Sequence, residues 1–141
     1  MRQERFIERE LRAAILMQQL SVVYQPIVDG DGRLNSLEAL VRWDHPALGA
    51  VSPKEFIPLA EETGLINSIG EWVLIQACQT ANTWRQHTTD DIRVSVNVSA
   101  VQFRGSDLIR KVSNALQISS LPAPLLELEI TERVLVEDNP D

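Results

Sequence analysis

Oxygen-bearing side chains recur on three segments of the sequence that otherwise read as strands. Glu38 lies in the segment 34–43, Asn97 in the alternating run 92–98, and Glu129 in the alternating run 125–131. A strand that is buried on both faces reads as nearly continuous apolar sequence, so these polar residues need a specific reason to be there. Carboxylate and amide oxygens suit a hard divalent cation. The three residues are therefore candidate ligands for Mg²⁺ or Mn²⁺.

Arg42 lies further along the same strand face as Glu38. A guanidinium can hold a phosphate through a forked pair of hydrogen bonds. Metal ligands beside a phosphate-binding arginine indicate phosphodiester chemistry. Each of these polar residues, taken singly, also fits a strand-end group that ordinary hydrogen bonds satisfy. The pattern therefore leaves two interpretations open, a metal site and a set of structural polar groups.

Helical patterns separate the predicted strands. Apolar residues recur at helical spacing in three stretches, at 6–19, 67–86 and 106–117. A further helix is expected to begin at Ser52-Pro53-Lys54-Glu55, a capping box with proline at the first helical position, and to end at Gly64. Residues 132–138 look like the start of one more helix.

The order of the elements predicts an α/β fold. The Asp29–Gly32 turn joins strands 22–28 and 34–43 into an antiparallel hairpin, and alternating strands and helices then predict a parallel sheet. We predict an incomplete (β/α) TIM-type barrel with an initial antiparallel hairpin strand. Residues 1–20 would form an N-terminal helix and residues 21–141 the first half of the barrel. The carboxyl ends of barrel strands form the active-site mouth, where the three candidate ligands would converge.

The composition is that of an ordinary globular chain and argues against some classes of function. The net charge of −7 over 141 residues disfavours binding to long nucleic acids. No run approaches the ~18 consecutive apolar residues of a membrane span. Cys78 is the only cysteine, which excludes an internal disulfide and favours a cytoplasmic location. His45 and His87 lie at no metal-binding spacing and are expected at the surface or in loops.

Five blocks of sequence resemble the EAL domain family, the bacterial phosphodiesterases that linearise cyclic-di-GMP. The blocks are Tyr24-Gln25-Pro26, Glu38-Ala39-Leu40 followed by Val41-Arg42-Trp43, Phe56 to Ile66, Asn97-Val98-Ser99 with Gln102-Phe103, and Glu127 to Glu132. Their order and spacing match through nearly the whole chain. The family fold is a modified TIM barrel whose first hairpin strand runs antiparallel, in agreement with the fold predicted above.

The resemblance implies a role for each matching residue. The metal ligands, for Mg²⁺ or Mn²⁺, would be Glu38, Asn97 and Glu129. The residues that bind cyclic-di-GMP would be Gln25, Leu40 and Arg42, with Arg42 at a phosphate. Glu132 would stabilise a loop near the metals and the dimer contact. The implied reaction is metal-dependent hydrolysis of cyclic-di-GMP to linear pGpG, and the implied partners are a second copy of the chain and GGDEF or sensor domains in the parent protein.

The family also carries an Asp-Asp-Phe-Gly block followed by a lysine and a glutamate, and none of these lies within residues 1–141. We therefore expect this chain to be a truncated EAL domain that binds metal weakly or not at all and has no activity alone. Two copies are expected to bury the open side of the half barrel against each other. The alternative function is a catalytically inert module that binds cyclic-di-GMP or a protein partner.

Overall fold

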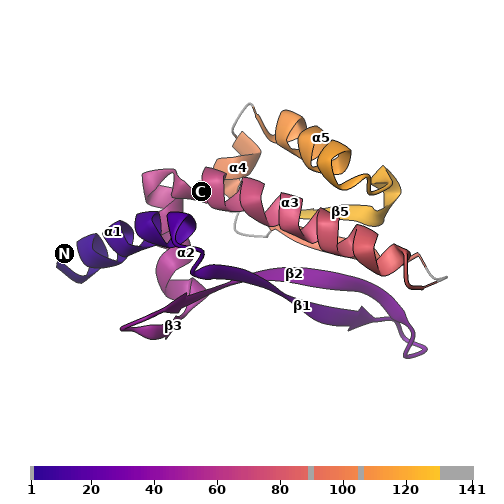
Figure 1. Cartoon of the computed structure of the whole chain (residues 1–141), viewed down its shortest axis with the longest axis horizontal. Coiled ribbons are helices and arrows are strands. Elements are labelled where there is room, and N and C mark those ends of the chain that lie inside the picture. Colours follow the sequence, from indigo (N-terminus) through magenta and orange to yellow (C-terminus); the bar gives the residue numbers. More distant parts are fainter. Residues whose placement is uncertain (1, 89–90, 105–106, 131–141) are drawn as a thin grey trace, which may run out of the picture.

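The computed structural model describes residues 2–88, 91–104 and 107–130 (Figure 1). The helices are α1 (Arg2–Leu16), α2 (Pro53–Thr63), α3 (Leu65–Arg85), α4 (Ala100–Arg104) and α5 (Leu108–Ser119), with a 3₁₀ turn at Ala123–Leu125. The strands are β1 (Leu20–Val28), β2 (Leu34–His45), β3 (Gly49–Val51), β4 (Arg93–Val98) and β5 (Leu126–Ile130). The predicted helix at 132–138 lies outside the described residues.

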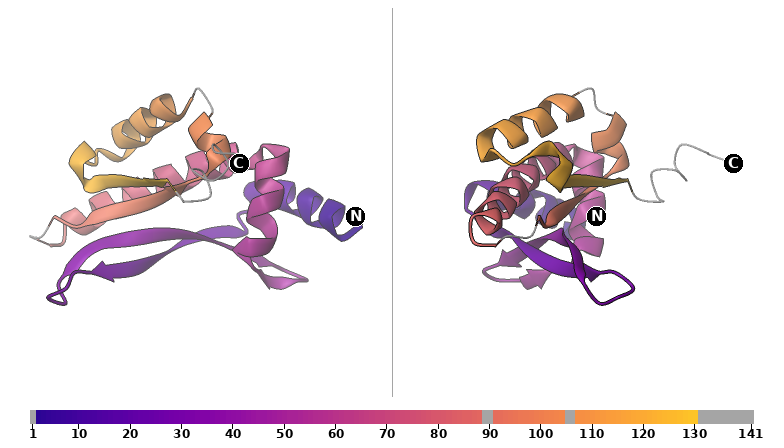
Figure 2. Two further views of the ribbon diagram at one scale, coloured as in Figure 1. Left: turned by 180° about the vertical axis from the view of Figure 1, so that it is seen from behind. Right: turned by 90° about the vertical axis from the view of Figure 1, so that its right-hand side faces the viewer.

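The strands form one mixed sheet in the order β1-β2-β4-β5, with β3 paired to the end of β2. β1 and β2 are antiparallel, whereas β2, β4 and β5 run parallel to one another. α3 and α5 lie on one side of this curved sheet (Figure 2). In the strand order, β1 forms one edge of the sheet and β5 forms the opposite edge. This arrangement confirms the predicted α/β partial barrel with an initial antiparallel strand.

The two faces of the sheet differ in chemistry, and we name them by what they carry. The outer face is turned toward the helices and holds Ala39, Trp43, Val94 and Val96, which all belong to the buried core. The inner face holds the alternate residues of the same strands, among them Glu38, Asn97 and Glu129. The alternation arises because successive side chains of a strand point to opposite sides.

Local signals set the bounds of α2 as predicted. The Ser52 hydroxyl accepts a hydrogen bond from the Lys54 N–H at 3.3 Å, so it satisfies one of the free donors at the start of the helix. The helix ends at Gly64, whose φ of 82° is a left-handed conformation that favours glycine. The same residue is the N-cap of α3, so a single residue separates α2 from α3.

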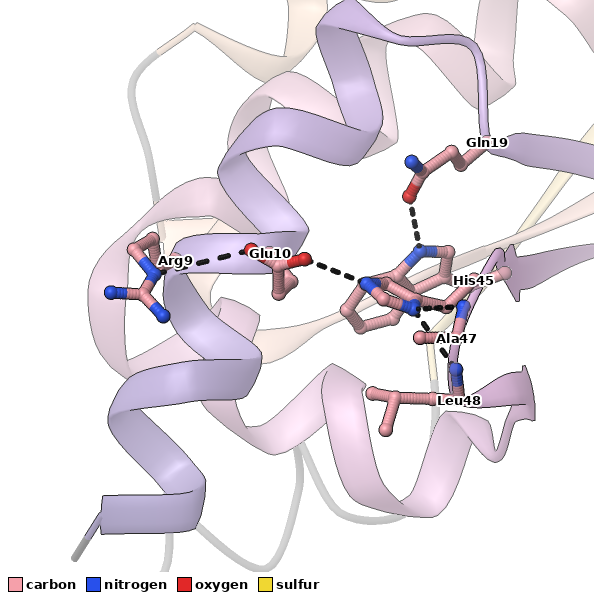
Figure 3. Close-up of polar contacts among 7 residues, drawn as sticks. Arg9, Glu10, Gln19, His45, Ala47 and Leu48 are labelled. Carbon is pink, nitrogen blue, oxygen red and sulfur yellow. Dashed lines mark hydrogen bonds and ion pairs between the residues drawn. The ribbon is translucent and has the colours of Figure 1, made fainter.

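His45 is buried, so its predicted place at the surface or in a loop was wrong. Its Nδ1 atom accepts hydrogen bonds from the Ala47 and Leu48 N–H groups at 3.0 Å each, which places its proton on Nε2. Nε2 then donates to Glu10 Oε1 at 2.7 Å (Figure 3). This bond joins α1 to the end of β2. His87 is exposed in a turn, as predicted.

A second attachment joins the turn after α1 to the same end of β2. Trp43 Nε1 donates to Gln19 Oε1 at 3.1 Å, and the Asp44 N–H donates to the Gln19 carbonyl oxygen at the same distance. The N-terminal helix is therefore held to the strand that carries Glu38 and Arg42. No helix among the described residues is long and apolar enough to cross a membrane.

Candidate functional site

The inner face of the sheet brings the three predicted ligands together. Asn97 Nδ2 donates to Glu38 Oε2 at 3.1 Å, although the two residues are 59 positions apart in the chain. The strand register places Asn97 directly beside Glu129. Glu38 is half-buried, and the other two side chains are exposed at the end of the sheet. The geometry therefore joins residues from β2, β4 and β5 in one row.

The contact between Asn97 and Glu38 fixes which atoms remain available. Because the amide nitrogen of Asn97 faces Glu38, its carbonyl oxygen points elsewhere, and one carboxylate oxygen of Glu38 makes no hydrogen bond with the described residues. Two carboxylates and one amide oxygen are the donor types that Mg²⁺ and Mn²⁺ prefer. The described part of the chain has no group of three His, Cys, Asp or Glu side chains placed to hold a metal ion. The donor set thus fits a hard cation but is small.

Arg42 lies beyond Glu38 on the inner face and does not contact it. Its Nη1 atom donates to the Val41 carbonyl oxygen at 3.1 Å, and the side chain is half-buried. An arginine has five donors, so most of its hydrogen-bonding capacity remains available to an anion.

A cavity of about 340 Å³ opens beside Leu40 and Arg42. β2 and β4 pair only as far as Ala39 and Val96, and the strands separate beyond this pair. The cavity occupies the space between them, and Asn97 is also part of its wall. α2 and α3 supply an apolar wall that includes Ile57, Ile66, Ile69 and Val73. A largely apolar group could therefore lie next to the arginine.

Gln25, another predicted site residue, does not line this cavity. Gln25 is exposed on β1, where it pairs in register with Glu38. It lies one strand away from the row of predicted ligands. Glu132 falls outside the described residues.

The inner face continues from this row toward the starts of β4 and β5. The sequence analysis predicted no function for the residues there. Arg93 and Glu127 form an ion pair at 2.9 Å. Ser95 lies between Glu38 and Glu127 in the strand register, is fully buried, and its hydroxyl has no hydrogen-bond partner among the described residues. Ser95 and Glu127 each stand two residues before a predicted ligand, which is the signal that places them on the same face.

A family model described as EAL domain matches residues 8–141. The chain belongs to the EAL domain family. Its fold also matches the solved structure of the MucR phosphodiesterase in complex with c-di-GMP, with a TM-score of 0.88 at 41% identity. That match covers 95% of this chain and 55% of the MucR chain.

Two curated relatives from Pseudomonas aeruginosa show the same similarity in sequence. The bifunctional diguanylate cyclase/cyclic di-GMP phosphodiesterase MucR is 43% identical over 130 residues, which cover 92% of this chain and 19% of MucR. The cyclic di-GMP phosphodiesterase NbdA is 42% identical over 135 residues, which cover 95% of this chain and 17% of NbdA. The chain thus spans less than a quarter of the length of these two relatives.

Proposed function

We propose that this EAL chain supplies one side of the catalytic site of a cyclic-di-GMP phosphodiesterase that produces linear pGpG. Glu38, Asn97 and Glu129 would hold Mg²⁺ or Mn²⁺. Arg42 would bind a phosphate of the dinucleotide, with Leu40 and Gln25 beside it. The observation that carries the proposal is the row of three oxygen-bearing side chains from three parallel strands, closed by the 3.1 Å hydrogen bond between Asn97 and Glu38.

Each side chain would contribute a definite property to the reaction. A bound divalent cation would act as a Lewis acid toward the phosphodiester. The hydrogen bond from Asn97 holds the Glu38 carboxylate in a fixed orientation, so less reorganisation is needed when the substrate binds. The Arg42 guanidinium would neutralise phosphate charge and orient the dinucleotide, while the cavity beside Leu40 would receive an apolar face of a base.

The small donor set leads us to propose weak metal binding and negligible turnover by residues 1–141 alone. Three oxygen ligands leave a Mg²⁺ or Mn²⁺ ion with most of its preferred six positions to be filled by water. Incubation of the purified chain with cyclic-di-GMP and Mn²⁺ should therefore give no pGpG by liquid chromatography. Formation of pGpG would contradict this proposal.

A matched pair of substitutions on β5 tests the ligand assignment. Glu129→Gln removes the negative charge of a proposed ligand, whereas Glu127→Gln removes the same charge two residues earlier, in the ion pair with Arg93. We expect Mn²⁺ to broaden the amide NMR signals around Asn97 in the parent chain and in Glu127→Gln, and to do so much less in Glu129→Gln. Equal broadening in both variants, or none in the parent chain, would contradict the ligand set.

Hydrolysis can be tested in a hybrid in which residues 8–130 replace the matching segment of the MucR EAL domain. The rest of the site then comes from a relative that is 43% identical over the matched region. We expect turnover in the folded hybrid and its loss in the Glu38→Gln variant. A folded hybrid that keeps its activity after this substitution would remove Glu38 from the site.

The cavity also supports a second function, a module that binds cyclic-di-GMP or a protein without hydrolysis. Leu40 and Arg42 line the cavity without contributing to the metal row, so binding there need not depend on a cation. Calorimetry of cyclic-di-GMP binding in EDTA and in Mn²⁺ distinguishes the two functions. Equal affinity in both conditions favours the binding module, and affinity that requires Mn²⁺ favours the phosphodiesterase.

We further propose self-association, with two copies meeting at the open side of the sheet. Within the described residues β5 pairs only with β4, and Leu128 and Ile130 on it are exposed. An open strand edge with exposed apolar groups favours association. Light scattering at micromolar concentrations should report a dimer, and a monomer would contradict it. The same proposal includes a loop-stabilising role for Glu132 near that contact. It also includes GGDEF or sensor domains in the parent protein and a cytoplasmic location.

A further inference from the structure

The short helix α4 begins directly after the strand that carries Asn97. Ser99 precedes its first residue, and the Ser99 hydroxyl accepts a hydrogen bond from the Gln102 N–H at 3.3 Å. In return, Gln102 Oε1 accepts from the Ser99 N–H at 3.1 Å. This reciprocal pair is a capping box, in which a side chain at each position satisfies a backbone donor of the other. It fixes the peptide two residues after Asn97.

The side-chain amide group of Gln102 packs closely against Gly70 of α3. Only 7% of Gln102 is exposed. A Cβ atom added to Gly70 would lie 1.8 Å from Gln102 Nε2 and 2.6 Å from its Cδ, so a methyl group and this side chain cannot occupy the site together. Glycine in the interior of a helix is less favourable than alanine. The close approach of Gln102 gives Gly70 a packing reason to be in α3.

The residues on either side of Ser99 are anchored as well. Val98 and Ala100 are both almost completely buried, whereas Asn97 is exposed on the inner face. Asn97 is thus the last inner-face residue before a run of chain that is fixed by packing on one side and by the capping box on the other. We therefore expect a displacement of Ser99 to move the Asn97 backbone and weaken its hydrogen bond to Glu38.

From this geometry we infer that Gly70, Ser99 and Gln102 are positioning residues for Asn97. They act through the end of β4 and direct the Asn97 amide toward Glu38. The inference rests on the proposed function only in giving Asn97 a ligand role, because the hydrogen bond between Asn97 and Glu38 can be measured without metal. Substitution of a residue that orients a metal ligand commonly changes metal affinity by about tenfold or more.

The test compares variants of the 141-residue chain by NMR without metal. Ser99→Ala removes the hydroxyl acceptor, and Ser99→Thr keeps it. We expect the side-chain NH₂ signals of Asn97 to change in Ser99→Ala in the same direction as in Glu38→Ala, which removes the acceptor. In Ser99→Thr they should keep the chemical shifts of the unsubstituted chain. Gly70→Ala should act like Ser99→Ala. Gly30→Ala is its control, because Gly30 has no atom within 4 Å of an added Cβ and no positive φ.

Addition of Mn²⁺ then separates this inference from the proposed function. About tenfold weaker Mn²⁺ binding in Ser99→Ala and Gly70→Ala, with normal binding in Ser99→Thr, supports the inference. Unchanged Asn97 NH₂ signals in folded Ser99→Ala and Gly70→Ala would overturn it, whatever the metal does. If the parent chain binds no Mn²⁺ while the Asn97 signals shift as expected, the ligand assignment fails and the positioning role stands. A Gly70→Ala variant that does not fold leaves the Ser99 pair to decide.

Discussion

The outer and inner faces of the sheet are built from the same strands, but the outer face is apolar and packed against helices whereas the inner face carries polar side chains. On the outer face of β4, Val94, Val96 and Val98 are almost completely buried against the helices. On the inner face of the same strand, Asn97 is exposed and bonded to Glu38, and Ser95 has a buried hydroxyl with no partner among the described residues. The outer face provides stability, and the inner face gives up stability to present polar groups. Substitutions on the two faces should therefore separate folding from ligand binding.

The largest effect is expected at Trp43, on the outer face near the end of β2. Its ring packs edge-on against Phe56 at 5.6 Å between centroids, and only 1% of the residue is exposed. Trp43→Ala should lower the free energy of unfolding by about 3–5 kcal/mol, because it leaves a large cavity. Urea denaturation followed by circular dichroism measures this loss. The inner-face change Leu40→Ala should cost much less and reduce cyclic-di-GMP binding instead; a larger stability loss at Leu40 would break the comparison.

The next effect concerns His45, on the outer-face side of β2. His45→Ala removes the acceptor of two backbone N–H groups and the partner of Glu10. We expect a loss of about 1–3 kcal/mol, since three hydrogen bonds and the packing of a buried ring are lost together. Glu10→Gln keeps an acceptor for the His45 proton and should cost less. Urea midpoints of the two variants measure the difference, and equal losses would show that the charge of Glu10 matters more than its hydrogen bond.

A pH-dependent effect is expected from Cys78, which packs beneath the outer face. Burial raises the pKa of the Cys78 thiol from 9.0 to about 11, and a hydrogen bond with Ser119 opposes part of that rise. The unfolded thiol loses its proton first as the pH increases, so the stabilisation is complete below pH 9 and is lost between pH 9 and 11. The stability difference between the parent chain and Cys78→Ala should shrink across this range in urea titrations. A constant difference would contradict the raised pKa.

The smallest effect is expected at Ser95 and is best measured beside Ser119. Both serines are buried, but the Ser119 hydroxyl donates to the Leu116 carbonyl oxygen at 3.3 Å and accepts from the Leu121 N–H at 3.1 Å. Ser119→Ala should cost about 1 kcal/mol, whereas Ser95→Ala should be neutral or slightly stabilising because no hydrogen bond is lost. Thermal unfolding of the two variants provides the measurement. A clear loss at Ser95 would show that its hydroxyl has a partner after all.

Patterns within a single element made much of the fold predictable from the sequence. Period-two alternation placed Asn97 and Glu129 on one face of their strands, and Ser52 with Gly64 marked the ends of α2. β3 has three residues and α4 has five, so neither is long enough to show a period. The capping pair of Ser99 and Gln102 was the local signal that could have predicted α4.

Contacts between distant residues were not predictable in the same way. The burial of His45 depends on Glu10, which lies 35 positions earlier, and no local pattern reports that partner. The bond between Asn97 and Glu38 and the cavity beside Arg42 depend on how β2 and β4 first pair and then separate. The sequence predicted which residues share a face but not which atoms meet.

The double pairing of β2 has a consequence for the order of folding. The pairing of β2 with β1 closes across a short turn, in which Asp29 accepts hydrogen bonds from the Asp31 and Arg33 N–H groups. The pairing of β2 with β4, by contrast, joins Glu38 to Asn97 across 59 positions of the chain. Local pairing closes a small loop and forms rapidly, and distant parallel pairing is slow. We therefore expect the hairpin to be structured in the folding transition state and the row of ligands to be completed last. Kinetic phi-values near one at Val22 and near zero at Val96 would match this order. The hairpin would then fold before the proposed ligand residues come together.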